Sequence, residues 1–192
     1  MAGDFRIPRF YKTLLALALV LGPIYWLMFT PDGKRRTDIV ILSLLGRPAF
    51  DAALDAFDDR LTESRLRESF PALDLACAQS PNAFGDRICT AVIGSFNQYP
   101  ARALSLFFKA ERLSAVKVLY QRAYHAQIRA WVERRPGLRG ATAGPHLSQG
   151  VGTWQVAGGT LVMRDGELGR SDEPALFWLS TAAIQGWTPP GG

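Results

Sequence analysis

The chain has 192 residues, of which 48% are hydrophobic and 20% are charged, with a formal net charge of +5. This composition is typical of a globular protein and excludes a largely disordered one. Basic residues are spread along the chain, and the one tight cluster, Lys34, Arg35 and Arg36, directly follows an apolar stretch. A cluster in that position is typical of contact with lipid headgroups, so we expect membrane lipids and no nucleic acid as partners.

The apolar stretch covers residues 10–30 and has no charged side chain between Thr13 and Thr30. As a helix, its 21 residues span about 31 Å, the thickness of one bilayer core. A cleaved signal peptide has a shorter apolar run and a small-residue cleavage site, and a buried core helix is seldom apolar on every face. Aromatic residues near both ends match the interfacial belt of a membrane helix. The sequence therefore predicts a retained transmembrane anchor.

Two neighbouring residues in the middle of this span, Gly22 and Pro23, bear on how it packs. Pro23 removes a backbone donor and favours a kink, whose cost is lower where another protein helix covers the freed carbonyl. Gly22 permits the close approach of a second helix. We expect both residues to contact another membrane helix.

The flanking charges do not decide the orientation of the span, because three basic residues precede it and three follow it. Both cysteines of the chain, Cys77 and Cys89, lie after the span. Two free thiols in the cytosol are one interpretation, but the C-x11-C spacing suits a disulfide in an oxidising compartment. We expect residues 1–9 to form a cytoplasmic tail, and the rest of the chain to lie on the periplasmic side of a bacterial inner membrane.

Residues 31–61 are expected to form a juxtamembrane linker and helix. We predict a turn at Pro31–Gly33 and, at residues 38–46, a short helix lying against the membrane or a partner. The clearest helical pattern runs from Pro48 to Leu61, where apolar residues recur at spacings of three and four. Acidic residues on its other faces do not match a calcium loop and indicate a solvated surface. These acidic residues are Asp51, Asp55, Asp58 and Asp59.

Residues 62–187 are expected to form one α+β domain, followed by a tail at 188–192. Thr62 is a predicted N-cap for a helix at 63–69, and a second helix is predicted at 124–135. Loops are expected at 79–86 and 137–150. The expected strands are 88–96, 103–108, 113–120, 153–157, 160–164 and 175–180.

The hairpin around Gly158-Gly159 is the sharpest local signal, and we expect a positive φ at both glycines. The helices and strands fall into two halves, 62–120 and 122–181, each with one helix followed by strands. Their natural packing is a layer of helices on one face of a continuous antiparallel sheet, with a single transmembrane helix before it.

This order resembles the small α+β envelope modules of the outer-membrane assembly lipoprotein type and the tandem version found in β-lactamase inhibitor proteins. The resemblance rests on the short helix at 61–71, the strand pair at 103–120 and the hairpin at 154–163. The chain departs from the lipoproteins because it has an apolar helix where they have a lipid-modified cysteine. The resemblance implies a binding or assembly module with no active site.

The sequence contains no constellation that identifies a reaction. His125 lies on a predicted helix, and His146 lies in the glycine-rich loop with no nucleophile beside it. Ser95 has only one of the two glycines of a nucleophile elbow. We therefore predict that the protein is not an enzyme and needs no metal or cofactor.

These observations predict a non-catalytic accessory or assembly subunit of a bacterial inner-membrane complex, with integral membrane subunits as partners. Trp187, after the last strand, is the candidate partner contact. Two alternatives remain open. One is a stand-alone, membrane-anchored periplasmic binding module or inhibitor. The other is a membrane-tethered hydrolase.

Overall fold

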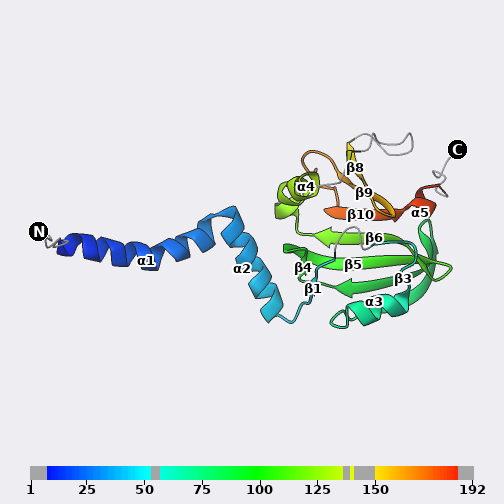
Figure 1. The fold of residues 1–192 in the computed structure, drawn as a ribbon, viewed down its shortest axis with the longest axis horizontal. Helices are drawn as coiled ribbons and strands as arrows, with labels where there is room; N and C mark the ends of the chain where they lie inside the picture. The colour runs from blue at the N-terminus through cyan, green and yellow to red at the C-terminus, as the bar shows by residue number, and fades with distance from the viewer. Residues whose placement is uncertain (1–7, 53–56, 136–138, 141–149, 186–192) are drawn as a thin grey trace, which may run out of the picture.

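The structure is a computed structural model that describes residues 8–52, 57–135, 139–140 and 150–185. It has an α+β fold in which a helical arm leads into a domain built on a sheet (Figure 1). The arm consists of α1 (Arg9–Phe29) and α2 (Pro31–Leu44). Trp187 and His146 lie outside the described residues.

Helix α1 coincides with the predicted span. Its segment Phe10–Phe29 is long and apolar enough to cross a membrane, and none of it is buried by the other described residues. The helix continues through Pro23. Among the described residues it is the one helix that meets these conditions of length and composition.

Helix α2 corrects the turn predicted at Pro31–Gly33, because these residues form its first turn. Thr30 is the N-cap, and its hydroxyl oxygen accepts a hydrogen bond from the backbone N–H of Gly33 at 3.0 Å. Pro31 occupies the first helical position, where its fixed φ suits the helix and its missing N–H costs nothing. The helix expected from residue 38 onward is therefore the C-terminal part of a longer one.

The helix predicted from Pro48 to Leu61 is wrong for the described residues in that range. Ala49–Phe50 form strand β1, which pairs in parallel with β4 (Ser95–Phe96). Phe50 is fully buried, with its ring centroid 4.7 Å from that of Phe70 and 6.0 Å from that of Phe96. These long-range contacts outweigh the local helical spacing. The solvated helix face expected for Asp51, Asp58 and Asp59 is therefore absent, and Asp55 lies outside the described residues.

The described strands form one mixed sheet, which corrects the expectation of a purely antiparallel one. Its main order is β2–β3–β5–β6–β10–β9–β8–β7, with antiparallel neighbours throughout, and β4 with its parallel partner β1 branches from β5. The remaining bounds are β2 (Ala76–Asn82), β3 (Gly85–Val92), β5 (Tyr99–Lys109), β6 (Arg112–Tyr120), β7 (Arg139–Gly140), β8 (Val151–Val156), β9 (Gly159–Arg164) and β10 (Ala175–Ser180).

The loop predicted at 79–86 is instead a hairpin, because β2 extends to Asn82 and β3 begins at Gly85. The Asn82 side chain accepts a hydrogen bond from the backbone N–H of Phe84 at 2.8 Å and so closes the turn. Cys77 and Cys89 are directly opposite each other in this hairpin. They form the predicted disulfide, with an S–S distance of 1.98 Å.

The hairpin of β8 and β9 is present, but its turn lies one residue earlier than predicted. Val156 pairs with Gly159, so Ala157 and Gly158 form the turn, and of the two glycines only Gly158 has a positive φ. Gly159 is a strand residue, where a Cβ would lie 2.2 Å from the carbonyl oxygen of Leu179. Glycine is needed there for the close approach of β10 rather than for the turn.

Helices α3 (Glu63–Ser69) and α4 (His125–Glu133) each precede one half of the sheet. A 3-10 turn, Arg122–Tyr124, leads into α4, and a short helix α5 (Thr181–Gln185) follows β10. Leu66 of α3 and Ile128 and Val132 of α4 join one hydrophobic core with the strands. The last strands of the two halves, β6 and β10, pair at the centre of the sheet.

Candidate functional site at the helical arm

The joint between α1 and α2 is closed by specific contacts. The Thr30 hydroxyl donates to the carbonyl oxygen of Trp26 at 2.6 Å, and the Arg36 guanidinium lies 5.8 Å from the centre of the Trp26 ring. Gly33 is buried against α1, and a Cβ there would lie 2.1 Å from the Trp26 carbonyl oxygen. Only glycine allows this approach, and α2 consequently leaves α1 crosswise (Figure 1).

Arg35 fastens the N-terminal half of α2 to the domain. Its guanidinium donates to the Asp32 carboxylate and to the carbonyl oxygen of Gln98, and it lies 5.3 Å from the centre of the Tyr99 ring. Only 13% of the Arg35 side chain is exposed. Hydrogen bonds from Arg35, and then from Arg36, lower the pKa of Asp32 below its usual value. The Arg35 side chain therefore links α2 to the turn between β4 and β5.

Two further contacts fasten the rest of α2. The Tyr124 hydroxyl donates to the Asp38 carboxylate at 2.6 Å, and burial, followed by this bond, raises the pKa of Tyr124. Leu42 packs closely on the backbone of Gly94, whose N–H donates to the carbonyl oxygen of Pro48. Residues 35, 38 and 42 are spaced by three and four positions, so they share one face of α2.

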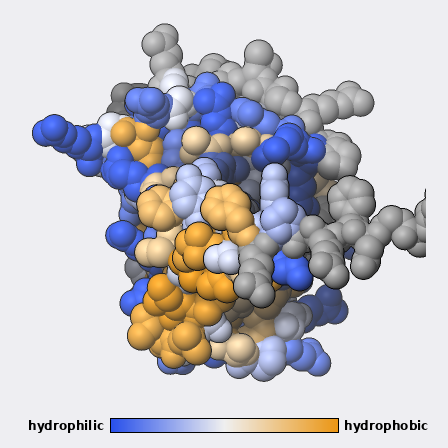
Figure 2. Space-filling model, turned by 90° about the vertical axis from the view of Figure 1, so that its left-hand side faces the viewer, coloured by the Kyte–Doolittle hydropathy of each residue, from blue (hydrophilic) through white to orange (hydrophobic). Residues whose placement is uncertain are grey.

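The other side of α2 carries large apolar side chains that nothing in the described chain covers. Val40 is 57% exposed, Ile41 50% and Leu44 82%. We call these three residues the outer face of α2. Figure 2 views the molecule from the side on which α1 projects, and hydrophobic residues gather in the centre and lower part of that view, with hydrophilic residues around them.

The basic cluster predicted to meet lipid headgroups is divided by the structure. Lys34 and Arg36 are exposed, whereas Arg35 is turned toward the domain. In the middle of α1, a Cβ at Gly22 would meet none of the described residues beyond its own helix within 4 Å. The face of α1 that carries Gly22 is therefore open to a neighbouring helix, as the sequence requires for the predicted contact.

His125 is a buried side chain with two structural partners. Its Nδ1 lies 2.7 Å from the Tyr120 hydroxyl and its Nε2 lies 2.8 Å from the carbonyl oxygen of Gly166. The carbonyl oxygen of Gly166 can only accept, so in the neutral ring Nε2 carries the proton and Nδ1 accepts from the Tyr120 hydroxyl, whose pKa burial raises. The ring then donates from Nε2 to Gly166, which ties α4 to the loop between β9 and β10.

One group of potential metal ligands occurs among the described residues: Glu63, Cys77 and Cys89. The two sulfur atoms are joined in the disulfide and offer no thiolate. The Glu63 carboxylate accepts hydrogen bonds from Arg87 at 2.8 Å and from Arg67 at 3.0 Å, and these, Arg87 first, lower its pKa. In the oxidised chain these groups stabilise the contact between α3 and the β2–β3 hairpin.

Comparisons of the chain with protein-family models, with curated proteins and with solved structures found no match. The resemblance to envelope lipoprotein and inhibitor modules stays a prediction.

Proposed function

We propose that the protein is a single-pass accessory or assembly subunit of a bacterial inner-membrane complex, without catalytic activity, whose α+β domain faces the periplasm. The observation that carries this proposal is the fastening of α2. Contacts of Arg35, Asp38 and Leu42 hold the domain to α2, and the Gly33 contact holds α2 to α1. A simple tether needs only a flexible linker. A closed joint instead favours a role in which the domain is presented at a fixed angle to neighbouring membrane subunits.

The face of α1 around Gly22 and Pro23 supports the same role, since none of the described residues outside α1 covers it. Purification in mild detergent tests it: we expect other membrane subunits to co-purify. Gly22→Leu should reduce their recovery because it blocks close helix approach. Ala16→Leu, which adds similar volume on another face of α1, is the matched control. A chain that purifies alone would contradict the subunit proposal and favour the stand-alone binding module.

The Cys77–Cys89 disulfide supports the periplasmic assignment, because such bonds persist in oxidising compartments. Labelling of intact cells with a membrane-impermeant maleimide tests it. We expect labelling only after treatment with a reductant. Labelling of free thiols only after the cytoplasm is opened would contradict the assignment. The hydrolase alternative gains no support from His125, since both of its ring nitrogens have structural partners.

A further inference from the structure

We infer that α2 lies in the interfacial layer of the bilayer that α1 crosses, with its outer face turned into the lipid. The occupant of this apolar face is thus the membrane itself. The inference rests on the proposed function in one respect, namely that α1 spans a membrane. It adds that the domain is seated on that membrane through a second, in-plane helix.

The distribution of side chains around α2 supports this placement. A helix turns about 100° per residue, so Val40 and Leu44 lie roughly opposite the face that Arg35, Asp38 and Leu42 turn to the domain. Lys34 and Arg36 fall on either flank of the outer face. Apolar residues bounded by cations are the pattern of a helix lying in a membrane interface, where lysine and arginine extend to the phosphates.

The position of α2 in the chain places lipid within its reach. Thr30 alone separates it from the end of α1, so α2 begins at the surface where the span leaves the bilayer. Because α2 runs crosswise to α1, a span that stands upright in the bilayer lays α2 along its surface (Figure 1). Figure 2 looks along α1 toward the domain, so the hydrophobic residues gathered in that view include those of α1 itself. With α2 at the membrane surface, lipid covers Val40, Ile41 and Leu44, and no additional partner is needed.

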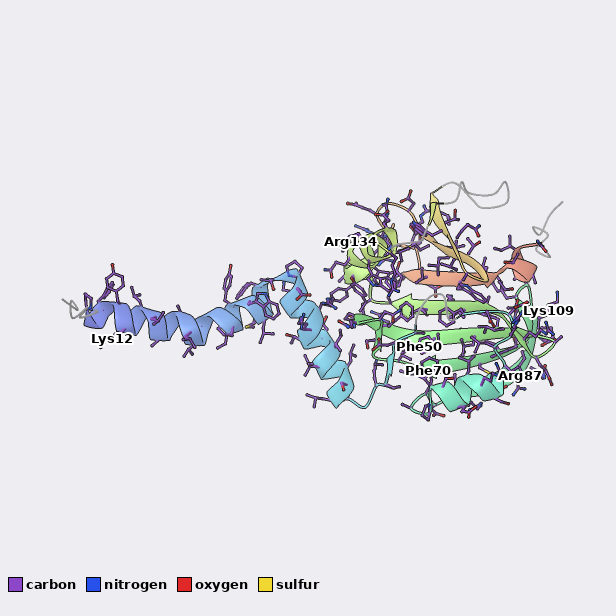
Figure 3. The ribbon with its side chains drawn as sticks, viewed as in Figure 1. Lys12, Phe50, Phe70, Arg87, Lys109 and Arg134 are labelled. Atoms are coloured by element: carbon purple, nitrogen blue, oxygen red, sulfur yellow. A yellow bond between two sulfur atoms is a disulfide. The ribbon has the colours of Figure 1, made fainter. Side chains whose placement is uncertain are left out.

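With α2 in the membrane interface, one side of the domain lies near the bilayer and the opposite side lies far from it. Arg134, at the C-terminal end of α4, lies on the side of the domain near the arm, whereas Lys109 and Arg87 lie at the other end of the sheet (Figure 3). Arg134 is exposed. Position 109 therefore serves as a water-exposed reference, far from the surface on which α2 is inferred to lie.

The test measures the surroundings of single nitroxide labels on the full chain in vesicles of phosphatidylcholine and phosphatidylglycerol. One cysteine at a time is introduced as Leu44→Cys, Leu19→Cys or Lys109→Cys, with the native disulfide kept oxidised. Collision rates with oxygen, which enters lipid, and with a nickel chelate, which stays in water, are compared. At position 19 we expect frequent collisions with oxygen and few with the nickel chelate, which we call lipid-like values. At position 44 we expect lipid-like values with a smaller difference between the two collision rates. At position 109 we expect water-like values, with frequent collisions with the nickel chelate.

Each of the other outcomes would overturn either the inference about α2 or the proposed membrane function. Water-like values at position 44, with lipid-like values at 19, would overturn the inference and leave the anchor in place. Protection of position 44 from both reagents would show that a second copy of the chain covers the outer face, and would also overturn it. Water-like values at position 19 would overturn the proposed membrane function itself.

A charge on the outer face provides an independent check. With the label at Ile41→Cys, Leu44→Glu should shift position 41 to water-like values, because a carboxylate resists entry into the lipid. Thr90→Glu adds the same charge at an exposed position of β3 and should leave position 41 unchanged. Unchanged lipid-like values with Leu44→Glu would overturn the inference.

Discussion

Helices α4 and α2 both lie against the domain, but they do so with opposite faces. Helix α4 buries Ile128 and Val132, which are 1% and 0% exposed, and turns charged residues outward. Helix α2 turns Arg35 and Asp38 to the domain and leaves Leu44 82% exposed. The two helices therefore have inverted amphipathic patterns relative to the same core.

The inversion is the pattern expected if the two helices have different outer environments, as inferred above. Charged residues belong on the outside of a helix that faces water, and α4 follows this rule. For α2, burying polar groups and exposing large apolar ones is unfavourable in water and favourable at a lipid surface. The inner contacts of α2 include directional hydrogen bonds from Arg35 and to Asp38, which fix its orientation on the domain more than they add to the stability of the core.

The largest expected difference between the helices is in the stability of the domain. Ile128→Ala removes a fully buried side chain of α4 and should lower the free energy of unfolding by about 2–5 kcal/mol. Leu44→Ala, the matched truncation on the outer face of α2, should change it by less than about 0.5 kcal/mol. Urea unfolding of the full chain in detergent, followed by tryptophan fluorescence, measures both. Equal losses would mean that Leu44 belongs to the domain core and would remove the contrast.

A substitution at Gly33 is expected to change the angle between α1 and α2 strongly while the domain stays folded. Gly33→Ala places a methyl group where the Trp26 carbonyl oxygen lies, so α1 and α2 must separate. Distances between spin labels at positions 19 and 109 should shift and broaden. Gly22→Ala is the control, because in the described structure its methyl group meets nothing beyond its own helix. An unchanged distance distribution in Gly33→Ala would show that other contacts define the angle.

The sequence predicted those elements whose signals are local. The helix Glu63–Ser69 begins after the Thr62 cap as expected, because the cap satisfies backbone donors within the same turn. The strand Ala175–Ser180 also matches its prediction. The helix predicted after Pro48 was wrong because this segment pairs with β4, which lies more than forty residues away in the sequence. Helical spacing of phenylalanines could not reveal a parallel strand pairing with so distant a segment.

The candidate site shows a different limit. The spacing of Arg35, Asp38 and Leu42 is visible in the sequence, as is the apolar set Val40, Ile41 and Leu44. Sequence periodicity separates the two faces of such a helix, but it does not say which face meets the domain. The usual rule places the apolar face inside. Only the contacts to Gln98 and Tyr124, made across large sequence separations, show that the polar face is the inner one.

A smaller effect is expected from the polar contact between α2 and the domain. A double-mutant cycle of Tyr124→Phe and Asp38→Ala should give a coupling free energy of about 1–2 kcal/mol, because the bond is charge-assisted but only partly buried. Unfolding in detergent measures it. A coupling near zero would mean that α2 is held by Arg35 and Leu42 alone.

The pH dependence of this contact has a defined sign. Burial and Asp38 raise the pKa of Tyr124 in the folded chain, so the phenol ionises more easily after unfolding. Its contribution to stability is fully present below the ordinary tyrosine pKa of about 10 and is lost as the pH rises above that value. Tyr124→Phe should therefore lose less stability in alkali than the natural chain. A steeper alkaline loss in the variant would contradict this assignment.

The smallest effect is expected at the contact between α3 and the β2–β3 hairpin, where a partly exposed ion pair joins the two elements. Glu63 pairs with Arg67 at 2.9 Å and Arg87 at 2.8 Å, but 26% of its side chain is exposed, so Glu63→Gln should lower the free energy of unfolding by only about 0.5–1 kcal/mol at neutral pH.

Because these partners lower the pKa of Glu63, the contribution of this ion pair to stability is present above the ordinary glutamate pKa of about 4.3. It is lost as the pH falls through the lower value of the folded chain. The natural chain should thus lose more stability in acid than Glu63→Gln, while Glu68→Gln on the same helix follows the natural chain. A cost at Glu63 as large as that of Ile128→Ala would mean that a partly exposed ion pair contributes as much to stability as the apolar core, and would contradict this prediction.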